Sequence, residues 1–386
     1  MKLIYLDNNA TTPVDPAVAE KMCLFIKDQF GNPSSLYPIG RTVKDFVTRA
    51  RESVARAIGA QRSEVFFTGS GTESDNWAIR GVLDACPDKR ELIISAIEHP
   101  AVLRMANDLE KKDYSVTYVP VDSDGVVSLE FLRRAVTPQT ALISIMHANN
   151  EIGTIQPIEE IVSLAREKGI PVHTDAVQSF GKIDIDVAKL GVDFLTLSAH
   201  KIYGPKGIGA LYIRKGAEIR PFIHGGHQEH GLRGGTENTV GIVGFGEAAR
   251  ILGERGKKDR ERIAKLTDAL KKGIEEKIPR IKFNGHPEKR VKNTLNIAFP
   301  GLEGEAILLA LATKEICVST GSACSSESEE VSHVLLSIGL KPEIARSCLR
   351  ISLGRFNTEE DVQGTLEVLP EIISRLRQIS GFEPGE

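Results

Sequence analysis

The sequence predicts an α/β fold: a large domain around a mostly parallel seven-stranded sheet, followed by a smaller α+β domain. Short apolar segments alternate with amphipathic helical patterns through the first two-thirds of the chain, as in parallel sheets covered by helices. These segments are nearly continuous in apolar residues, which indicates a sheet covered on both faces. After about Gly253 a long charged helical pattern begins, which marks the change to the second domain.

Seven segments predict the strands of the large sheet, each rich in β-branched or aromatic residues. They are residues 64–68, 91–97, 115–121, 141–147, 170–176, 193–198 and 209–214. Helical periodicity separates several of them, as at 42–60 and 158–169. A chain of 386 residues exceeds what one hydrophobic core usually holds. We therefore expect a large domain over 15–253 and a small domain that combines 1–14 with 254–386.

The small domain is predicted from a helical pattern and a few short segments. The amphipathic stretch 253–278 reads as a connecting helix. Strand and helix candidates follow it at 293–299, 304–314, 316–320 and 349–354. These elements predict an α+β unit, which is smaller than the first.

Composition narrows the class of protein. A net charge of −3 argues against a general nucleic-acid binder, which should be basic. The N-terminus lacks a signal-peptide pattern, and no apolar run reaches the roughly 20 residues of a spanning helix. The five cysteines are odd in number and irregularly spaced, which disfavours a disulfide framework. We expect a cytoplasmic protein that associates with neither nucleic acid nor membrane.

Polar residues stand where the predicted strands end, which is where ligands bind in parallel sheets. A glycine-rich turn at 69–72 opens a helix and could bind an anion, although a plain helix cap explains it equally well. Later strand ends carry a histidine, two asparagines, a carboxylate with a glutamine, and a lysine: His99, Asn149, Asn150, Asp175, Gln178 and Lys201. Each has a structural explanation when taken alone, such as a cap or a turn.

Lys201 changes how this set is interpreted. It follows a predicted buried strand, whereas Lys206 lies in a turn and should be exposed. A lysine held in a buried position becomes a Schiff-base amine or nucleophile. Together with an anion-binding turn and a carboxylate, it fits an aldehyde cofactor that carries a phosphate and a pyridine ring.

The order of the motifs resembles the cysteine desulfurases, which are class V, fold-type I pyridoxal-phosphate transferases. The matching segments are "YLDNNATTPVDPAV", "GNPSS", "FTGSGTESDN", "EHPAV", "HANNEIGTIQPI", "HTDAVQSFGK", "SAHKIYGPKGIG", "RGGTENT", "STGSACSS" and "LRISLGRFNTEEDV". They extend over nearly the whole chain, from about residue 5 to about residue 365, so the resemblance is specific.

The resemblance implies roles for individual residues. Lys201 would form the Schiff base, Asp175 would pair with the ring nitrogen, and Gln178 would bind the ring hydroxyl. His99 would stack on the ring and assist proton transfer. The phosphate and its surroundings would be bound by Gly71, Thr72, Ser198, Ala199 and His200, and by Thr236 of a neighbouring subunit, which implies a homodimer. Arg350 and Asn150 would bind the carboxylate of the substrate L-cysteine.

Cys324 matches the family's nucleophilic cysteine, and its small polar neighbours predict an accessible, mobile loop. The resemblance implies that it takes sulfur from L-cysteine as a persulfide, that L-alanine is released, and that an iron–sulfur scaffold protein accepts the sulfur for cluster assembly. No intrinsic metal is expected, although Cys324 could ligate a cluster shared with that scaffold.

Other functions fit parts of the same pattern. A selenocysteine lyase or a β-eliminating lyase would keep Lys201 and Asp175 without needing Cys324. A non-enzymatic sulfur-assembly scaffold would keep only the fold. A zinc site at His224, His227 and His230 is a minor alternative. The chain also departs from the family pattern at Tyr37, where histidine is usual, and at Gly71, where alanine is common.

Overall fold

The computed structural model describes residues 3–321 and 331–380. Its centre is a seven-stranded sheet with the strand order β2-β8-β7-β6-β5-β3-β4. The strands are β2 (Val65–Thr68), β3 (Glu91–Ser95), β4 (Ser115–Val119), β5 (Thr140–Ser144), β6 (Val172–Asp175), β7 (Phe194–Ser198) and β8 (Gly209–Ile213). All seven predicted strands are present. Five pair in parallel, and β8 pairs antiparallel with both of its neighbours, so the sheet is mixed and mostly parallel.

Helices cover both faces of this sheet because successive strand side chains point to opposite sides. In β3, Leu92 and Ile94 belong to one core while Ile93 belongs to the other. The helices of this part of the chain are α1 (Pro16–Asp28), α2 (Pro38–Ala57), α3 (Gly71–Ala85), α4 (Pro100–Glu110), α5 (Leu129–Ala135), α6 (Ile158–Arg166) and α7 (Val187–Leu190). Helices α3 and α4 pack on the face of Leu92, and α2 and α6 on the face of Ile93.

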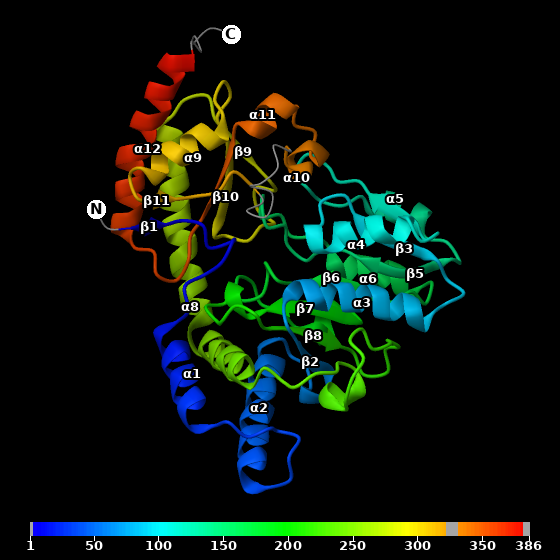
Figure 1. The fold of residues 1–386 in the computed structure, drawn as a ribbon. Coiled ribbons are helices and arrows are strands. Elements are labelled where there is room, and N and C mark those ends of the chain that lie inside the picture. The colour runs from blue at the N-terminus through cyan, green and yellow to red at the C-terminus, as the bar shows by residue number, and fades with distance from the viewer. Residues whose placement is uncertain (1–2, 322–330, 381–386) are drawn as a thin grey trace.

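The smaller unit has its own core and two small sheets. Strands β12 (Cys348–Ser352), β10 (Thr294–Ala298) and β9 (Lys282–Asn284) form an antiparallel sheet. The N-terminal β1 (Ile4–Tyr5) pairs in parallel with β11 (Ile316–Cys317), so the start of the chain lies with its end (Figure 1). The helices are α9 (Gly304–Ala312), α10 (His333–Ser337), α11 (Pro342–Arg346) and α12 (Glu359–Ser380).

Helix α8 (Thr239–Lys277) joins the two units as one continuous element of 39 residues. Figure 1 shows it extending from the side of α1 and α2 up to α12. The predicted helix began at residue 253 and was therefore too short. The missed part contains three glycines, and the one at 246 lets the helix approach α2: a Cβ there would lie 2.4 Å from the Cα of Ala50. The predicted boundary at 253/254 falls inside this helix, and the division into domains stays a prediction.

Candidate active site

A cavity of about 430 Å³ lies at the carboxyl ends of the parallel strands. It opens between the large sheet, the N-terminal segment 9–11 and β12 of the smaller unit. Ten of the predicted site residues line it: Gly71, Thr72, His99, Asn150, Asp175, Gln178, Ser198, His200, Lys201 and Arg350. Residues up to 341 positions apart in sequence thus meet here, from Asn9 to Arg350.

Lys201 reaches the cavity from a short 3-10 helix, Ala199–Lys201, that follows β7. Its Nζ donates hydrogen bonds to the main-chain oxygens of Asn9 (2.5 Å) and Ala10 (2.7 Å). Two carbonyl dipoles therefore hold the amine against the N-terminal segment. Lys206 lines the same cavity but is exposed, as expected from its turn.

Asp175 ends β6 and is 7% exposed. Its Oδ1 accepts a hydrogen bond from the Val177 N–H at 2.8 Å, which fixes the carboxyl group at the cavity wall. Burial raises the pKa of Asp175, while that hydrogen bond and the charge of Lys201 act in the opposite direction.

A second buried carboxyl group, Asp75, lines the cavity beside Asp175. Burial, followed by the charge of Asp175, raises the pKa of Asp75 well above its ordinary value. Burial also lowers the pKa of the neighbouring His173 to about 3, so that ring is neutral and does not form an ion pair with Asp75 across 3.6 Å. Of these three groups, Asp175 is the one placed to stay charged, because it also faces Lys201.

His99 caps helix α4, and its Nδ1 accepts the Ala101 N–H at 3.1 Å. The proton of the neutral ring is therefore on Nε2. Burial, with the charges of Lys201 and His333, lowers the pKa of His99 to about 4. At neutral pH the cavity thus receives an uncharged imidazole, which can donate one hydrogen bond or transfer one proton.

The turn before α3 forms the part of the wall suited to an anion. Helix α3 has 15 residues and begins at Gly71, and its N-terminal end faces the cavity with Thr72, Ser198 and His200 nearby. Helix N-termini attract anions through free N–H groups and the helix dipole. A Cβ at position 71 would lie 3.0 Å from Cγ2 of Val177, so glycine relieves a close contact where the family pattern has alanine.

Arg350 lines the cavity from β12 and is 1% exposed. Its Nη2 donates to Asp7 Oδ1 (2.7 Å) and its Nη1 to the Asn150 main-chain oxygen (3.3 Å). Among the described residues its Nε has no hydrogen-bond partner. Asn149 instead turns inward: its Oδ1 accepts the N–H groups of residues 151 and 152 and holds the turn together. The structure thus brings Asn150, and not Asn149, to the cavity.

Three predicted residues do not line this cavity. Ala199 is fully buried at the start of the 3-10 helix, where its main-chain oxygen accepts the N–H groups of residues 202 and 204. Thr236 is exposed and absent from the cavity wall. Cys324 lies outside the described residues. In the described ranges no cluster of His, Cys, Asp or Glu is suited to a metal ion, and His230 packs against the ring of Phe66.

Asn9, which lines the cavity, and Lys182, which lies beside it, had no role in the sequence-based prediction. Asn9 donates through Nδ2 to the Asn150 oxygen (3.0 Å) and to Thr294 Oγ1 (2.8 Å), and so links the two units. Lys182 contacts both Asn9 and Gln178. Both lie in segments that carry the family resemblance, "DNNATT" and "QSFGK". Their position in these segments was the feature of the sequence that could have identified them.

Comparison with known proteins identifies the family. The family model Aminotransferase class-V matches residues 4–364. Cysteine desulfurase IscS of Methanosarcina thermophila is 51% identical over 386 residues, covering 100% of this chain and 95% of that protein. A cysteine desulfurase of Nostoc sp. is 48% identical over 100% of this chain and 96% of its own.

Solved structures agree with this result. A NifS-like protein superposes with a TM-score of 0.91 at 42% identity and covers 97% of this chain and 100% of its own. SspA in complex with cysteine gives a TM-score of 0.82 at 40% identity, over 92% of this chain and 99% of its own. The chain therefore belongs to the class-V aminotransferase family and, within it, to the pyridoxal-phosphate-dependent cysteine desulfurases.

Proposed function

We propose that this cysteine desulfurase binds pyridoxal 5'-phosphate in the cavity at the strand ends and transfers the sulfur of L-cysteine to Cys324. The observation that carries the proposal is the convergence of Lys201, Asp175 and Arg350 on one cavity. When bound, the cofactor supplies an electron-withdrawing pyridinium ring that stabilises negative charge at the substrate α-carbon.

The residues present fit this cofactor. The N-terminal end of α3, with Thr72 and His200, suits its phosphate. A buried carboxylate, Asp175, suits a protonated ring nitrogen. Gln178 offers an amide to the ring hydroxyl from the same wall. The cavity therefore offers one suitable group to each of the cofactor's phosphate, ring nitrogen and ring hydroxyl.

Two groups of this chain would move protons. The Lys201 Nζ takes the proton from the substrate α-carbon, and the Asn9 and Ala10 carbonyl groups that hold it set its approach. His99 presents a neutral Nε2–H to the cavity. It can therefore give a proton to the substrate side without placing a second positive charge beside Lys201.

Arg350 would bind the substrate carboxylate. Asp7 and the Asn150 main-chain oxygen orient its guanidinium at the cavity that Arg350 lines. The Cys324 thiolate then attacks the substrate sulfur. The carbon–sulfur bond breaks with its electron pair on carbon, which takes up a proton to give L-alanine, and Cys324 keeps the sulfur as a persulfide.

A homodimer would complete each site through Thr236 of the partner copy. Thr236 is exposed and away from its own cavity, which supports a role in the neighbouring subunit. Helix α1 and the loop to α2 also expose apolar side chains: Leu24, Ile26, Phe30, Leu36 and Tyr37. A group of this kind marks an interaction surface, and it lies at the lower edge of the molecule in Figure 1.

The sulfur acceptor that we propose is an iron–sulfur scaffold protein in the cytoplasm, in keeping with the IscS relatives. Within the described ranges no helix is long and apolar enough to cross a membrane.

The test is to add L-cysteine to the purified protein and to measure alanine and protein-bound sulfane sulfur. The Cys324→Ala variant should keep the cofactor absorbance and lose the bound sulfur. Sulfide release without any persulfide on the native protein would instead favour a β-eliminating lyase.

A further inference from the structure

Two lysine side chains bind the same asparagine at the edge of the active site. Lys201 Nζ donates to the main-chain oxygen of Asn9 at 2.5 Å. Lys182 Nζ donates to Asn9 Oδ1 at 2.6 Å and to Gln178 Oε1 at 2.5 Å. Lys201 has a role in the reaction, but nothing so far accounts for Lys182.

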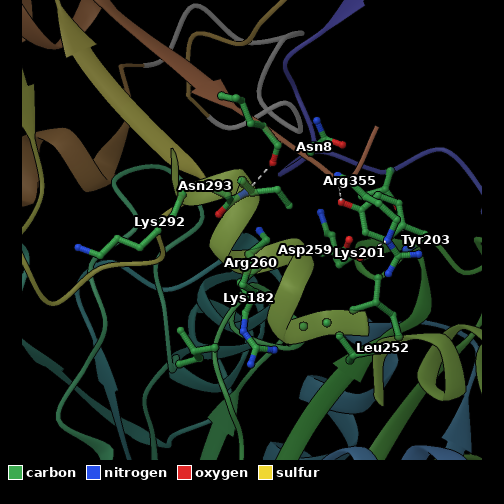
Figure 2. A pocket seen from close by; sticks show the side chains of 18 of the residues that line it. Asn8, Lys182, Lys201, Tyr203, Leu252, Asp259, Arg260, Lys292, Asn293 and Arg355 are labelled. Carbon is green, nitrogen blue, oxygen red and sulfur yellow. Dashed lines mark hydrogen bonds and ion pairs between the residues drawn. The ribbon is translucent and has the colours of Figure 1, made fainter. Parts of the chain in front are cut away.

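Lys182 does not line the cofactor cavity. It lines a second cavity of about 420 Å³, which shares Lys201 with the first and is bordered by α8. Figure 2 shows Lys182 and Lys201 among the side chains around this second cavity. Lys182 is therefore not positioned to touch the substrate or the cofactor, and it must act through the residues that it contacts.

The contact with Gln178 settles which edge of that amide faces the active site. An ammonium group has donors only, whereas a side-chain amide has one acceptor edge and one donor edge. Lys182 occupies the oxygen of Gln178. The amide nitrogen of Gln178 therefore faces the other way. It donates one hydrogen to the main-chain oxygen of Asn9 at 2.9 Å, and its second hydrogen is available to the cavity that Gln178 lines.

We propose that Lys182 is a positioning residue: it fixes the orientation of the Gln178 amide, so that an N–H group and not an oxygen faces the ring hydroxyl of the cofactor. This rests on the proposed binding of pyridoxal phosphate in the cavity. Without Lys182 the amide can rotate by half a turn and present its oxygen, which cannot donate to the cofactor.

The charge of Lys182 is costly where it lies. Among the described residues it has no carboxylate partner within 4.0 Å, and its acceptors are two neutral amides. Burial, then the charges of Lys201 and Arg350, lower the pKa of Lys182 well below its ordinary value. A methionine would fill similar space without that cost. What methionine cannot supply is a hydrogen-bond donor, and the proposal rests on that property.

The test compares Lys182→Met, Gln178→Leu and the double variant as holoproteins. The first readout is the pH at which the visible band of the bound cofactor changes. Losing the N–H donor makes the ring oxygen more basic, so we expect this midpoint to rise by about 0.5–1 pH unit in Lys182→Met. The second readout is the cofactor concentration for half-saturation, which should rise about 3–10-fold, as for one lost hydrogen bond.

The double variant separates this role from a simple charge effect. If Lys182 acts through Gln178, the double variant should match Gln178→Leu in both readouts. All other titratable groups that line the cofactor cavity are unchanged in these variants: Asp75, His99, Asp175, His200, Lys201, Lys206 and Arg350.

Two results would overturn the proposal: an unchanged midpoint in Lys182→Met, or an equal shift when Gln178 is already leucine. The latter would mean that Lys182 acts by charge alone. If Lys182→Met does not fold, Lys182→Gln keeps one donor and should keep the native midpoint. A native protein that shows no visible band when given the cofactor would instead refute the proposed function.

Discussion

Two regions that border the active site are built in different ways. At the carboxyl edge of the large sheet, buried polar groups have incomplete hydrogen bonding: Asp75 Oδ1, Glu98 Oε2 and His147 Nδ1 have no partner among the described residues. The second region, here called the connecting band, consists of residues 7–15 with Arg350 and Arg355. Residues 9–11 and Arg350 line the active-site cavity, whereas Arg355 lines the neighbouring cavity. There the charged groups are paired: Arg355 with Asp15 at 2.8 Å and Asp259 at 2.7 Å, and Arg350 with Asp7. Of the Arg350 guanidinium, Nε has no partner among the described residues.

This difference separates two physical tasks. Where buried titratable groups lack hydrogen-bond partners, the cost of removing them from water dominates, and it shifts their pKa values. Paired charges in a buried region hold groups in one geometry and are costly to break. We therefore expect substitutions at the sheet edge to change pH dependence and chemistry. Substitutions in the connecting band should change binding geometry and stability.

Lys201 joins the two regions, and its removal should have the largest effect. It is carried by the sheet edge and bonded to two carbonyl groups of the connecting band. We expect Lys201→Ala to lose roughly 10²–10⁴-fold or more in kcat, the usual contribution of a general base. Borohydride reduction followed by mass spectrometry should find no cofactor attached. The exposed Lys215→Ala is the control, and a cofactor trapped on the Lys201→Ala variant would contradict this assignment.

Arg350→Lys tests geometry in the connecting band. A lysine keeps the charge but loses the planar, two-pronged donor. We expect KM for L-cysteine to rise about 10–100-fold, and kcat to change less. Steady-state measurement of alanine formation separates the two. The exposed Arg346→Lys, on α11, serves as the matched control. A fall in kcat with an unchanged KM would instead mean that Arg350 acts in the chemical step and not in substrate binding.

The sheet edge could be predicted from the sequence, whereas most of the connecting band could not. Asp175 and Lys201 each follow a short apolar strand, and in parallel sheets consecutive strand ends meet at one edge. The partners of Asn9 and Arg355 are instead spread from Asp15 to Ser352, and no local pattern joins them. The early start of α8 was missed for a related reason, since the glycines at 244 and 246 are explained only by contacts with Met22 of α1 and Ala50 of α2.

Arg355→Met should reduce stability more than catalysis. The variant leaves Asp15 and Asp259 buried without their common cation. Removing one partner of a buried pair typically costs about 3–5 kcal/mol in the free energy of unfolding, which urea unfolding would measure. The exposed Arg250→Met breaks surface pairs with Glu247 and Glu254 and should cost no more than about 1 kcal/mol. Equal losses in the free energy of unfolding in the two variants would mean that the buried pairs of the connecting band stabilise the fold no more than surface pairs do.

Glu98 at the sheet edge gives the smallest expected effect near pH 5 and the sharpest dependence on pH. It is 1% exposed, and its Oε1 accepts from Ser95 Oγ (2.5 Å) and the Met146 N–H (2.9 Å). Burial raises the pKa of Glu98 to about 8, against the effect of those hydrogen bonds. The folded protein therefore keeps this proton at pH 7, whereas the unfolded chain, with an ordinary value near 4.5, has released it.

Because the folded state binds the extra proton, Glu98 makes the native protein lose stability as pH rises from about 4.5 to about 8. Glu98→Gln removes this titration and keeps an oxygen for Ser95 and Met146. Its free energy of unfolding, relative to the native protein, should rise by about 1.4 kcal/mol per pH unit in that window. Urea unfolding at several pH values checks this, with the exposed Glu130→Gln as control. If the free energies of unfolding of the native protein and of Glu98→Gln changed with pH in parallel, Glu98 would be charged in the folded protein. Burial would then not set the protonation of groups at the sheet edge.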